Sequence, residues 1–132
     1  MLKIKGLAEI VLHVHDMEKS LKFYRDLLGL TVISPPASRA VFLPAGPAAV
    51  TCPQQIVLSP LREGTPEFPK ERFKRPVHHL GFEISPQDFA AAEQRLRASG
   101  QEVRTGEHPF LPLNGLYIHD PDGNEVEFIA AR

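Results

Sequence analysis

An internal repeat limits the folds open to this chain more than any other feature of its sequence. A shift of 70 residues places Glu9 on His79 and Val57 on Glu127 without a gap. In both halves a β-prone run is followed by a helical pattern and by further β-prone runs, which predicts two βαβββ modules. We therefore expect an α+β fold in which the two modules form a cupped mixed sheet with the helices outside.

The ends of the predicted helices are marked by capping residues. Asp16 is a candidate N-cap for a helix that Gly29 ends, and Ser85 with Pro86 begins a second helix that Gly100 ends. The apolar positions between these residues repeat at helical spacing. Strands are predicted over residues 9–15, 30–33, 40–43, 54–59, 79–84, 101–104, 115–119 and 125–130.

Prolines separate the two halves of the chain. Many of the 13 prolines lie in residues 35–76, which indicates a loop-rich segment. We predict one domain over residues 1–132, with module one at about 5–60, a loop at about 59–76 and module two at about 77–131. Because a long loop inside a compact domain is usually functional or disordered, this loop is a candidate lid or linker.

The charge and the cysteine content exclude several classes of partner. The formal net charge is −1, so no field would attract nucleic acid or an anionic membrane, and a small-molecule partner is favoured. Cys52 is the only cysteine and cannot form an internal disulfide. The N-terminal residues contain no long apolar run, so we expect neither a signal peptide nor a membrane span, and a cytoplasmic location.

Three of the four repeat-related positions carry side chains that bind hard or borderline divalent ions. These three are Glu9, His79 and Glu127, whereas the fourth position is Val57. Gln55 lies two residues from Val57 on the same face of its strand and could substitute for it if the register slips. The repeat therefore predicts a metal site made of the two glutamates and the histidine, with the fourth ligand left open.

Four motifs lie at residues 14–24, 28–30, 79–82 and 120–127. They resemble those of the vicinal oxygen chelate superfamily, and the resemblance spans nearly the whole chain. This superfamily includes glyoxalase I, extradiol dioxygenases, methylmalonyl-CoA epimerase, and the fosfomycin and bleomycin resistance proteins. The resemblance implies metal ligands on the first and last strands of each half, and His79 and Glu127 match that pattern directly. It also implies a homodimer, which would protect the open edge strands.

Residues 106–127 resemble the signature of extradiol ring-cleavage dioxygenases throughout. In those enzymes the final glutamate binds iron(II), while a tyrosine and a histidine contact the catecholate and the bound oxygen. The resemblance assigns these roles to Glu127, Tyr117 and His108. Extradiol enzymes use two histidines and one carboxylate as ligands, whereas the set expected here has one histidine and two carboxylates.

Two further features bear on the chemistry of this site. Residues 59–77 contain no histidine that could act as the additional base of extradiol enzymes, so His78 and His13 are candidate substitutes. Glu125 and Glu127 lie in the same predicted strand, and we expect one of them to face solvent. The spacing of the signature selects Glu127 as the ligand.

Three functions are compatible with these motifs. The first is a dioxygenase of the extradiol type, with Fe(II) or Mn(II) as cofactor and Zn(II) or Ni(II) as alternatives, acting on a small diol-like or aromatic substrate. The second is a glyoxalase- or epimerase-like lyase or isomerase, in which Glu9 leaves the ion and acts as general base on a metal-stabilised enediolate. The third is a metal-free protein that binds a small molecule such as an antibiotic. The long signature favours the first.

Overall fold

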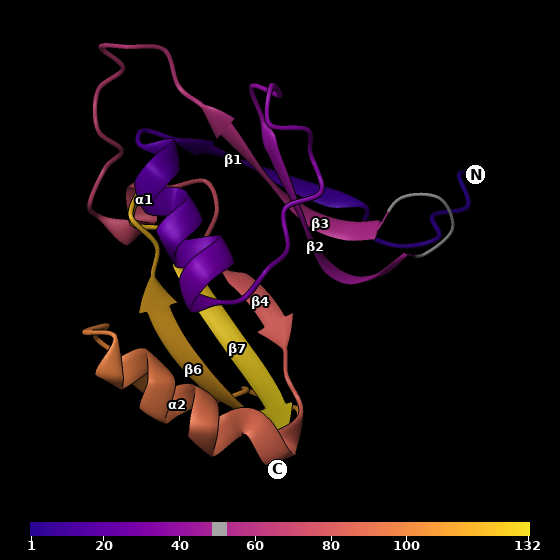
Figure 1. Cartoon of the computed structure of the whole chain (residues 1–132). Coiled ribbons are helices and arrows are strands. Elements are labelled where there is room, and N and C mark those ends of the chain that lie inside the picture. The colour runs from indigo at the N-terminus through magenta and orange to yellow at the C-terminus, as the bar shows by residue number, and fades with distance from the viewer. Residues whose placement is uncertain (49–52) are drawn as a thin grey trace. The chain divides into compact units, whose positions relative to one another are not determined.

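The computed structural model describes residues 1–48 and 53–132, so Cys52 lies outside the described residues. The chain divides into two units, Met1–Pro66 and Glu67–Arg132, each with its own open sheet (Figure 1). The two mixed sheets, of three and four strands, together with the helices confirm the predicted α+β class. Among the described residues, no helix combines the length and the apolar character that crossing a membrane requires.

The first unit contains a three-stranded sheet with the order β1-β3-β2. Strand β3 is central, pairs parallel with β1 and antiparallel with β2, and is buried at Ile56, Val57 and Leu58. Along β1, Leu12 and Val14 are buried while the intervening side chains are exposed, as the predicted alternation requires. The elements are β1 (Glu9–Val14), α1 (Met17–Leu21), η1 (Lys22–Leu27), β2 (Val41–Ala48) and β3 (Pro53–Pro60).

The first helical segment begins and ends where the sequence predicts. The Asp16 carboxylate accepts a hydrogen bond from the backbone N–H of Lys19 at 3.0 Å, which satisfies one free donor of the first turn. Gly29 follows the segment with φ of +80°, a conformation that costs glycine little. Between these ends α1 continues into η1, a π-helical stretch that buries Phe23 and Tyr24.

The strand predicted at residues 30–33 does not form, so the first unit is βαββ and not βαβββ. The backbone N–H of Ile33 donates to the carbonyl of Phe42 at 3.0 Å, but residues 30–33 form no ladder with β2. Pro35 and Pro36 follow one residue later, after Ser34, and have no N–H to donate. Residues 30–33 therefore stay irregular despite their β-prone side chains, because the prolines after them cannot donate hydrogen bonds to β2.

The second unit contains the complete βαβββ plan, with the sheet order β4-β7-β6-β5. Its second strand, predicted at 101–104, begins three residues later, at Arg104. Ser85 precedes the helical segment but makes no side-chain bond to the helix backbone; its hydroxyl contacts Gln87 instead. The elements are η2 (Arg72–Lys74), β4 (Leu80–Glu83), η3 (Pro86–Asp88), α2 (Phe89–Ala98), β5 (Arg104–Glu107), β6 (Leu113–His119) and β7 (Glu125–Ala131).

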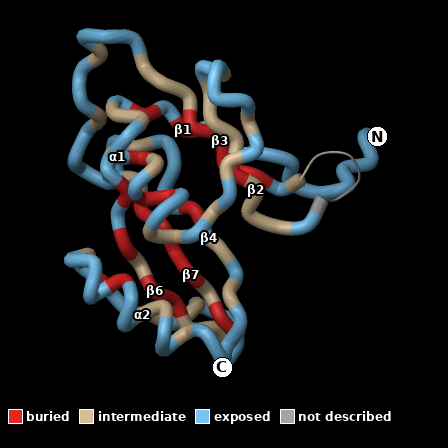
Figure 2. The backbone as a smooth tube through the Cα atoms, in the orientation of Figure 1, coloured by how far each residue is buried: buried red, intermediate tan, exposed pale blue. Residues whose placement is uncertain are grey.

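The two faces of the second sheet differ in character. One face is apolar, and helix α2 adds Leu96 to its core; the buried stretches of β6 and β7 are red in Figure 2. Each fully buried aliphatic side chain contributes about 1.5–3 kcal/mol to folding. The opposite face carries polar and ionisable side chains. The residues of the apolar face are Leu80, Phe82, Leu116, Ile118, Val126, Phe128 and Ala130.

Strand register confirms the internal repeat. In the parallel pairs, Ile10 lies opposite Ile56 and Leu80 lies opposite Val126, an offset of 46 residues in both units. A shift of 70 residues carries the first pair onto the second. Glu9, which begins β1, is therefore equivalent to His79, which directly precedes β4.

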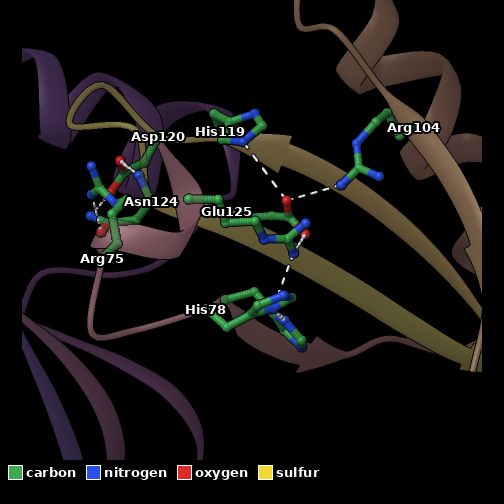
Figure 3. A network of polar contacts seen from close by, with 9 residues as sticks. Arg75, His78, Arg104, His119, Asp120, Asn124 and Glu125 are labelled. Carbon is green, nitrogen blue, oxygen red and sulfur yellow. Dashed lines mark hydrogen bonds and ion pairs between the residues drawn. The ribbon is translucent and has the colours of Figure 1, made fainter. Parts of the chain in front are cut away.

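The predicted loop contributes side chains to the second unit. Its only regular element is the short η2, as expected for a proline-rich segment. The Arg75 guanidinium donates to the carbonyl of Asp122 at 3.1 Å and to Asn124 Oδ1 at 2.8 Å. Asp120 Oδ1 accepts from the backbone of both residues, so Asp120 and Arg75 brace the turn that leads into β7 (Figure 3). The loop is thus held to the turn that positions the last strand.

Candidate functional site

Four residues form a row across the polar face of the second sheet. Strand pairing places Gly81, Glu127, Tyr117 and Arg104 opposite one another on β4, β7, β6 and β5. Directly opposed residues of neighbouring strands point to the same face and contact each other. The row therefore brings Tyr117 and Glu127, two residues predicted from the signature, side by side.

His79 and Glu127 supply two donors suited to one divalent ion. His79 Nε2 lies 3.2 Å from Glu127 Oε2, and the Glu127 side chain is buried while that of His79 is about one-third exposed. Two ligand atoms that each lie about 2.1 Å from an ion are roughly 3.0–3.5 Å apart. Imidazole nitrogen and carboxylate oxygen are ligands for Fe, Mn, Zn and Ni. The pair fits a metal ion by both distance and donor chemistry.

Tyr117 acts as a hydrogen-bond donor to Glu127. This bond, followed by desolvation, raises the pKa of Tyr117 from 10.0 to about 12. The Arg104 guanidinium lies 5.1 Å from the centre of the Tyr117 ring and opposes this rise only weakly. At neutral pH Tyr117 is therefore a protonated phenol that can donate a proton but cannot act as a base.

Glycine is required beside this pair. A Cβ atom on Gly115 would lie 2.9 Å from the Tyr117 hydroxyl oxygen and 3.0 Å from Glu127 Oε1. Gly106, which pairs with Gly115, also faces the Tyr117 ring, with a Cβ distance of 3.1 Å. Any other residue at position 115 would push the phenol and the carboxylate apart, so the fold reserves this space for them.

We expect Gly115→Ala to lower the pKa of Tyr117 from about 12 towards 10, because the added methyl group displaces the hydroxyl from Glu127. The folded-state pKa of the wild-type tyrosine lies above its unfolded value, so this bond stabilises the metal-free protein below pH 10 and is lost as the pH rises towards 12. Ultraviolet absorbance titration measures the pKa of Tyr117, with Tyr117→Phe to assign the signal, and urea unfolding at pH 8 and above measures the loss of stability. Gly81→Ala is the control, because its Cβ would make an ordinary contact of 3.4 Å with Glu127. A wild-type Tyr117 that titrates near 10 would contradict the assignment.

The sequence predicted that either Glu125 or Glu127 would face solvent, and this prediction was wrong. Residues two apart in a strand point to the same face. Both carboxylates are buried, at 5% and 7% exposure. Arg72 and Arg104 bind the Glu125 carboxylate at 2.7 Å and 2.9 Å, and His119 lies 3.8 Å from it (Figure 3). The one sequence signal that could have pointed to Glu125 is its place two residues before Glu127 in the same strand, which puts both carboxylates on one face.

His108 lies away from the pair formed by Tyr117 and Glu127. Its backbone N–H donates to the carbonyl of Leu113, four residues along β6 from Tyr117, which is about 13 Å on an extended strand. Its Nδ1 accepts the backbone N–H of Leu111 at 3.1 Å, so Nε2 carries the proton of the neutral ring. The structure thus places Tyr117, but not His108, next to Glu127.

Glu9 belongs to the first unit, where it is exposed at the start of β1. Its Oε2 accepts a hydrogen bond from Gln55 Nε2 at 2.9 Å, and the two residues are paired in register. Val57, at the fourth repeat position, is a buried core residue with 3% exposure. No group of three His, Cys, Asp or Glu side chains suited to a metal ion occurs within residues 1–48 and 53–132, so the donors that the structure brings together are His79 and Glu127.

Curated relatives of this chain include enzymes of two kinds. Metallothiol transferase FosB of Staphylococcus haemolyticus is 27% identical over 125 residues, covering 94% of this chain and 82% of the relative. Biphenyl-2,3-diol 1,2-dioxygenase of Paraburkholderia xenovorans is 30% identical over 126 residues, and the match covers 94% of this chain but only 40% of the dioxygenase. The chain is therefore similar in sequence both to a metallothiol transferase and to a dioxygenase.

Solved structures share the fold. A glyoxalase/dioxygenase from Nostoc punctiforme has a TM-score of 0.75 and 24% identity over 96% of this chain and 91% of that protein. The fosfomycin resistance protein FosX of Listeria monocytogenes, in a mutant form complexed with Mn(II), has a TM-score of 0.69 and 21% identity over 98% of this chain and 93% of that protein. The model of the Glyoxalase/Bleomycin resistance protein/Dioxygenase superfamily matches residues 6–128, so the chain belongs to this superfamily.

Proposed function

We propose that this protein is a divalent-metal-dependent enzyme in which His79 and Glu127 bind the ion. The observation that carries the proposal is the 3.2 Å separation of His79 Nε2 and Glu127 Oε2 on a half-buried sheet face. Glu9 stays the third ligand predicted by the repeat. Fe(II) or Mn(II) is the expected ion, with Zn(II) or Ni(II) as alternatives; when bound, it supplies a Lewis acid that polarises a substrate oxygen.

Ring cleavage of a catechol-like diol is the first candidate reaction. The signature over residues 106–127 and the 30% identity to a biphenyl-diol dioxygenase support it. Tyr117 remains protonated because its pKa is about 12, so it offers its hydroxyl proton to an anionic oxygen beside Glu127. Arg104 over the Tyr117 ring holds the phenol in place. Glu127 thus serves two partners, the phenol and the ion.

Oxygen uptake tests this reaction. Protein loaded anaerobically with Fe(II) should consume oxygen when catechol or 2,3-dihydroxybiphenyl is added, with a yellow ring-opened product. Tyr117→Phe should bind the same amount of Fe(II) but react about 10²–10⁴-fold more slowly, because a positioned proton donor contributes on this scale. Absence of oxygen uptake by Fe(II)-loaded and Mn(II)-loaded protein on a panel of catechols would reject the dioxygenase.

Thiol transfer is the second candidate, and the extent of the match supports it. The chain spans 82% of a metallothiol transferase but only 40% of the dioxygenase. The same metal-loaded protein should then consume a thiol in the presence of fosfomycin, measured by loss of free thiol and by mass spectrometry of the adduct. A protein that retains no metal and shows neither reaction would leave the small-molecule binding protein as the function.

A further inference from the structure

A continuous series of polar contacts connects the predicted loop to the candidate metal ligands. Arg72 Nη2 donates to Glu125 Oε1 at 2.7 Å and lies 3.0 Å from His78 Nδ1. His78 Nδ1 lies 2.7 Å from His79 Nδ1, and His79 Nε2 lies 3.2 Å from Glu127 Oε2. Figure 3 shows dashed lines that join Glu125 to a guanidinium group and this group to His78. Arg72 therefore contacts the buried carboxylate and the first histidine through one NH₂ group.

Donor and acceptor chemistry fixes the direction of each bond in this series. A guanidinium has only donors, so the Arg72 NH₂ group uses one hydrogen for Glu125 and the other for His78 Nδ1. His78 Nδ1 must then be an acceptor, and its single lone pair is shared by the two donors that approach it, Arg72 and His79. The His78–His79 bond consequently requires the proton to be on His79 Nδ1. The neutral His79 ring is left with a lone pair on Nε2.

This lone pair faces the Glu127 carboxylate. A neutral Nε2 atom and a carboxylate oxygen are both acceptors, so at 3.2 Å a cation between them is favourable. In the metal-free protein the carboxylate favours a proton on Nε2, and the bond from His79 Nδ1–H to His78 opposes this. A divalent ion satisfies both atoms at once. Histidines that bind metals through one nitrogen usually donate the other N–H to a neighbouring acceptor, which holds the tautomer and the ring orientation.

We propose that His78, held by Arg72, is a positioning residue that fixes the Nδ1–H tautomer of His79 and thereby directs Nε2 to the ion. The effect of His78 on metal affinity rests on the proposed function, whereas its effect on the tautomer of His79 does not. The residue equivalent to His78 in the first unit is Ala8, so no histidine occupies this place beside Glu9. The predicted loop contributes to the site through Arg72.

Two substitutions of His78 distinguish the role of its hydrogen-bond acceptor from the role of its size. In His78→Asn the side-chain oxygen takes the place of Nδ1 as acceptor, whereas His78→Leu provides none. His78 is exposed, so both variants should fold. Long-range ¹H–¹⁵N correlation spectra of the metal-free proteins, at a pH where the rings are neutral, report the tautomer of His79, and His79→Gln assigns its signals. Wild type and His78→Asn should show Nδ1–H, and His78→Leu should show a mixture or Nε2–H.

Metal affinity provides the second measurement. In chelator competition with Mn(II) and Zn(II), His78→Leu should bind about 10–100-fold more weakly than wild type, and His78→Asn should recover most of this loss. Arg72→Met, which removes the donor to His78, should change the tautomer in the same direction. If His78→Leu keeps both the tautomer and the affinity of wild type, the inference is wrong. If wild type binds no ion, the proposed function fails, and the tautomer spectra alone decide whether His78 positions His79.

Discussion

We expect His79→Ala and Glu127→Ala each to abolish stoichiometric binding of Fe(II) or Mn(II), while the fold survives. The two donor atoms lie 3.2 Å apart, and loss of either leaves too few protein ligands to hold a divalent ion through desalting. Elemental analysis after desalting measures the ion, and circular dichroism measures the fold. Glu127→Ala should also lower the pKa of Tyr117, because its carboxylate is the partner that raises it.

Two variants serve as controls for this result. His13→Ala removes a histidine that is exposed on β1 and should leave binding unchanged. Glu9→His should retain the ion and convert the expected ligand set into two histidines and one carboxylate, the set of extradiol enzymes. Wild-type protein that retains no ion after loading with excess Fe(II), Mn(II), Zn(II) or Ni(II) would overturn the metal-dependent function.

The second large effect concerns stability. Replacing both Arg72 and Arg104 by methionine should lower the free energy of unfolding by about 3–5 kcal/mol, because the Glu125 carboxylate is left buried without its guanidinium partners. The side chain of Glu125 is only 4% exposed, while those of the arginines are about half exposed. The double substitution therefore leaves the buried Glu125 carboxylate, which water reaches poorly, without its two arginines.

Urea unfolding measures this loss, and a third substitution tests its cause. Adding Glu125→Leu to the double variant removes the buried charge, so it should restore most of the stability. A double variant that loses less than about 1 kcal/mol, the usual scale of exposed ion pairs, would mean that solvent already screens Glu125. Equal instability of the double and triple variants would instead attribute the loss to packing.

The loop that separates the two predicted modules has a larger role than its composition indicates. Its prolines predict an irregular segment, and η2 is its only regular element. Its arginines, however, bind two parts of the second unit: Arg72 binds Glu125, and Arg75 binds the turn before β7. A change in this loop would thus affect both the buried carboxylate and the position of the last strand.

Local patterns in the sequence determined the elements and the repeat. Alternation along β1, the Asp16 cap and Gly29 at positive φ depend on contacts within a few residues, so they are readable without the fold. The 70-residue shift is also a property of the sequence, and the equal register of the two parallel pairs confirms it. The same reasoning led to His79 and Glu127 as candidate ligands.

Tertiary structure decided which polar groups meet. Residues 30–33 have β-prone side chains but form no strand, because their one backbone bond to β2, from Ile33 to Phe42, cannot continue into a ladder through the prolines that follow. Glu125 binds Arg72, 53 residues away, and no local pattern encodes that pairing. The tautomer of His79 depends on the donors of Arg72 and on His78, since a ring proton is placed by the groups that surround the ring in space.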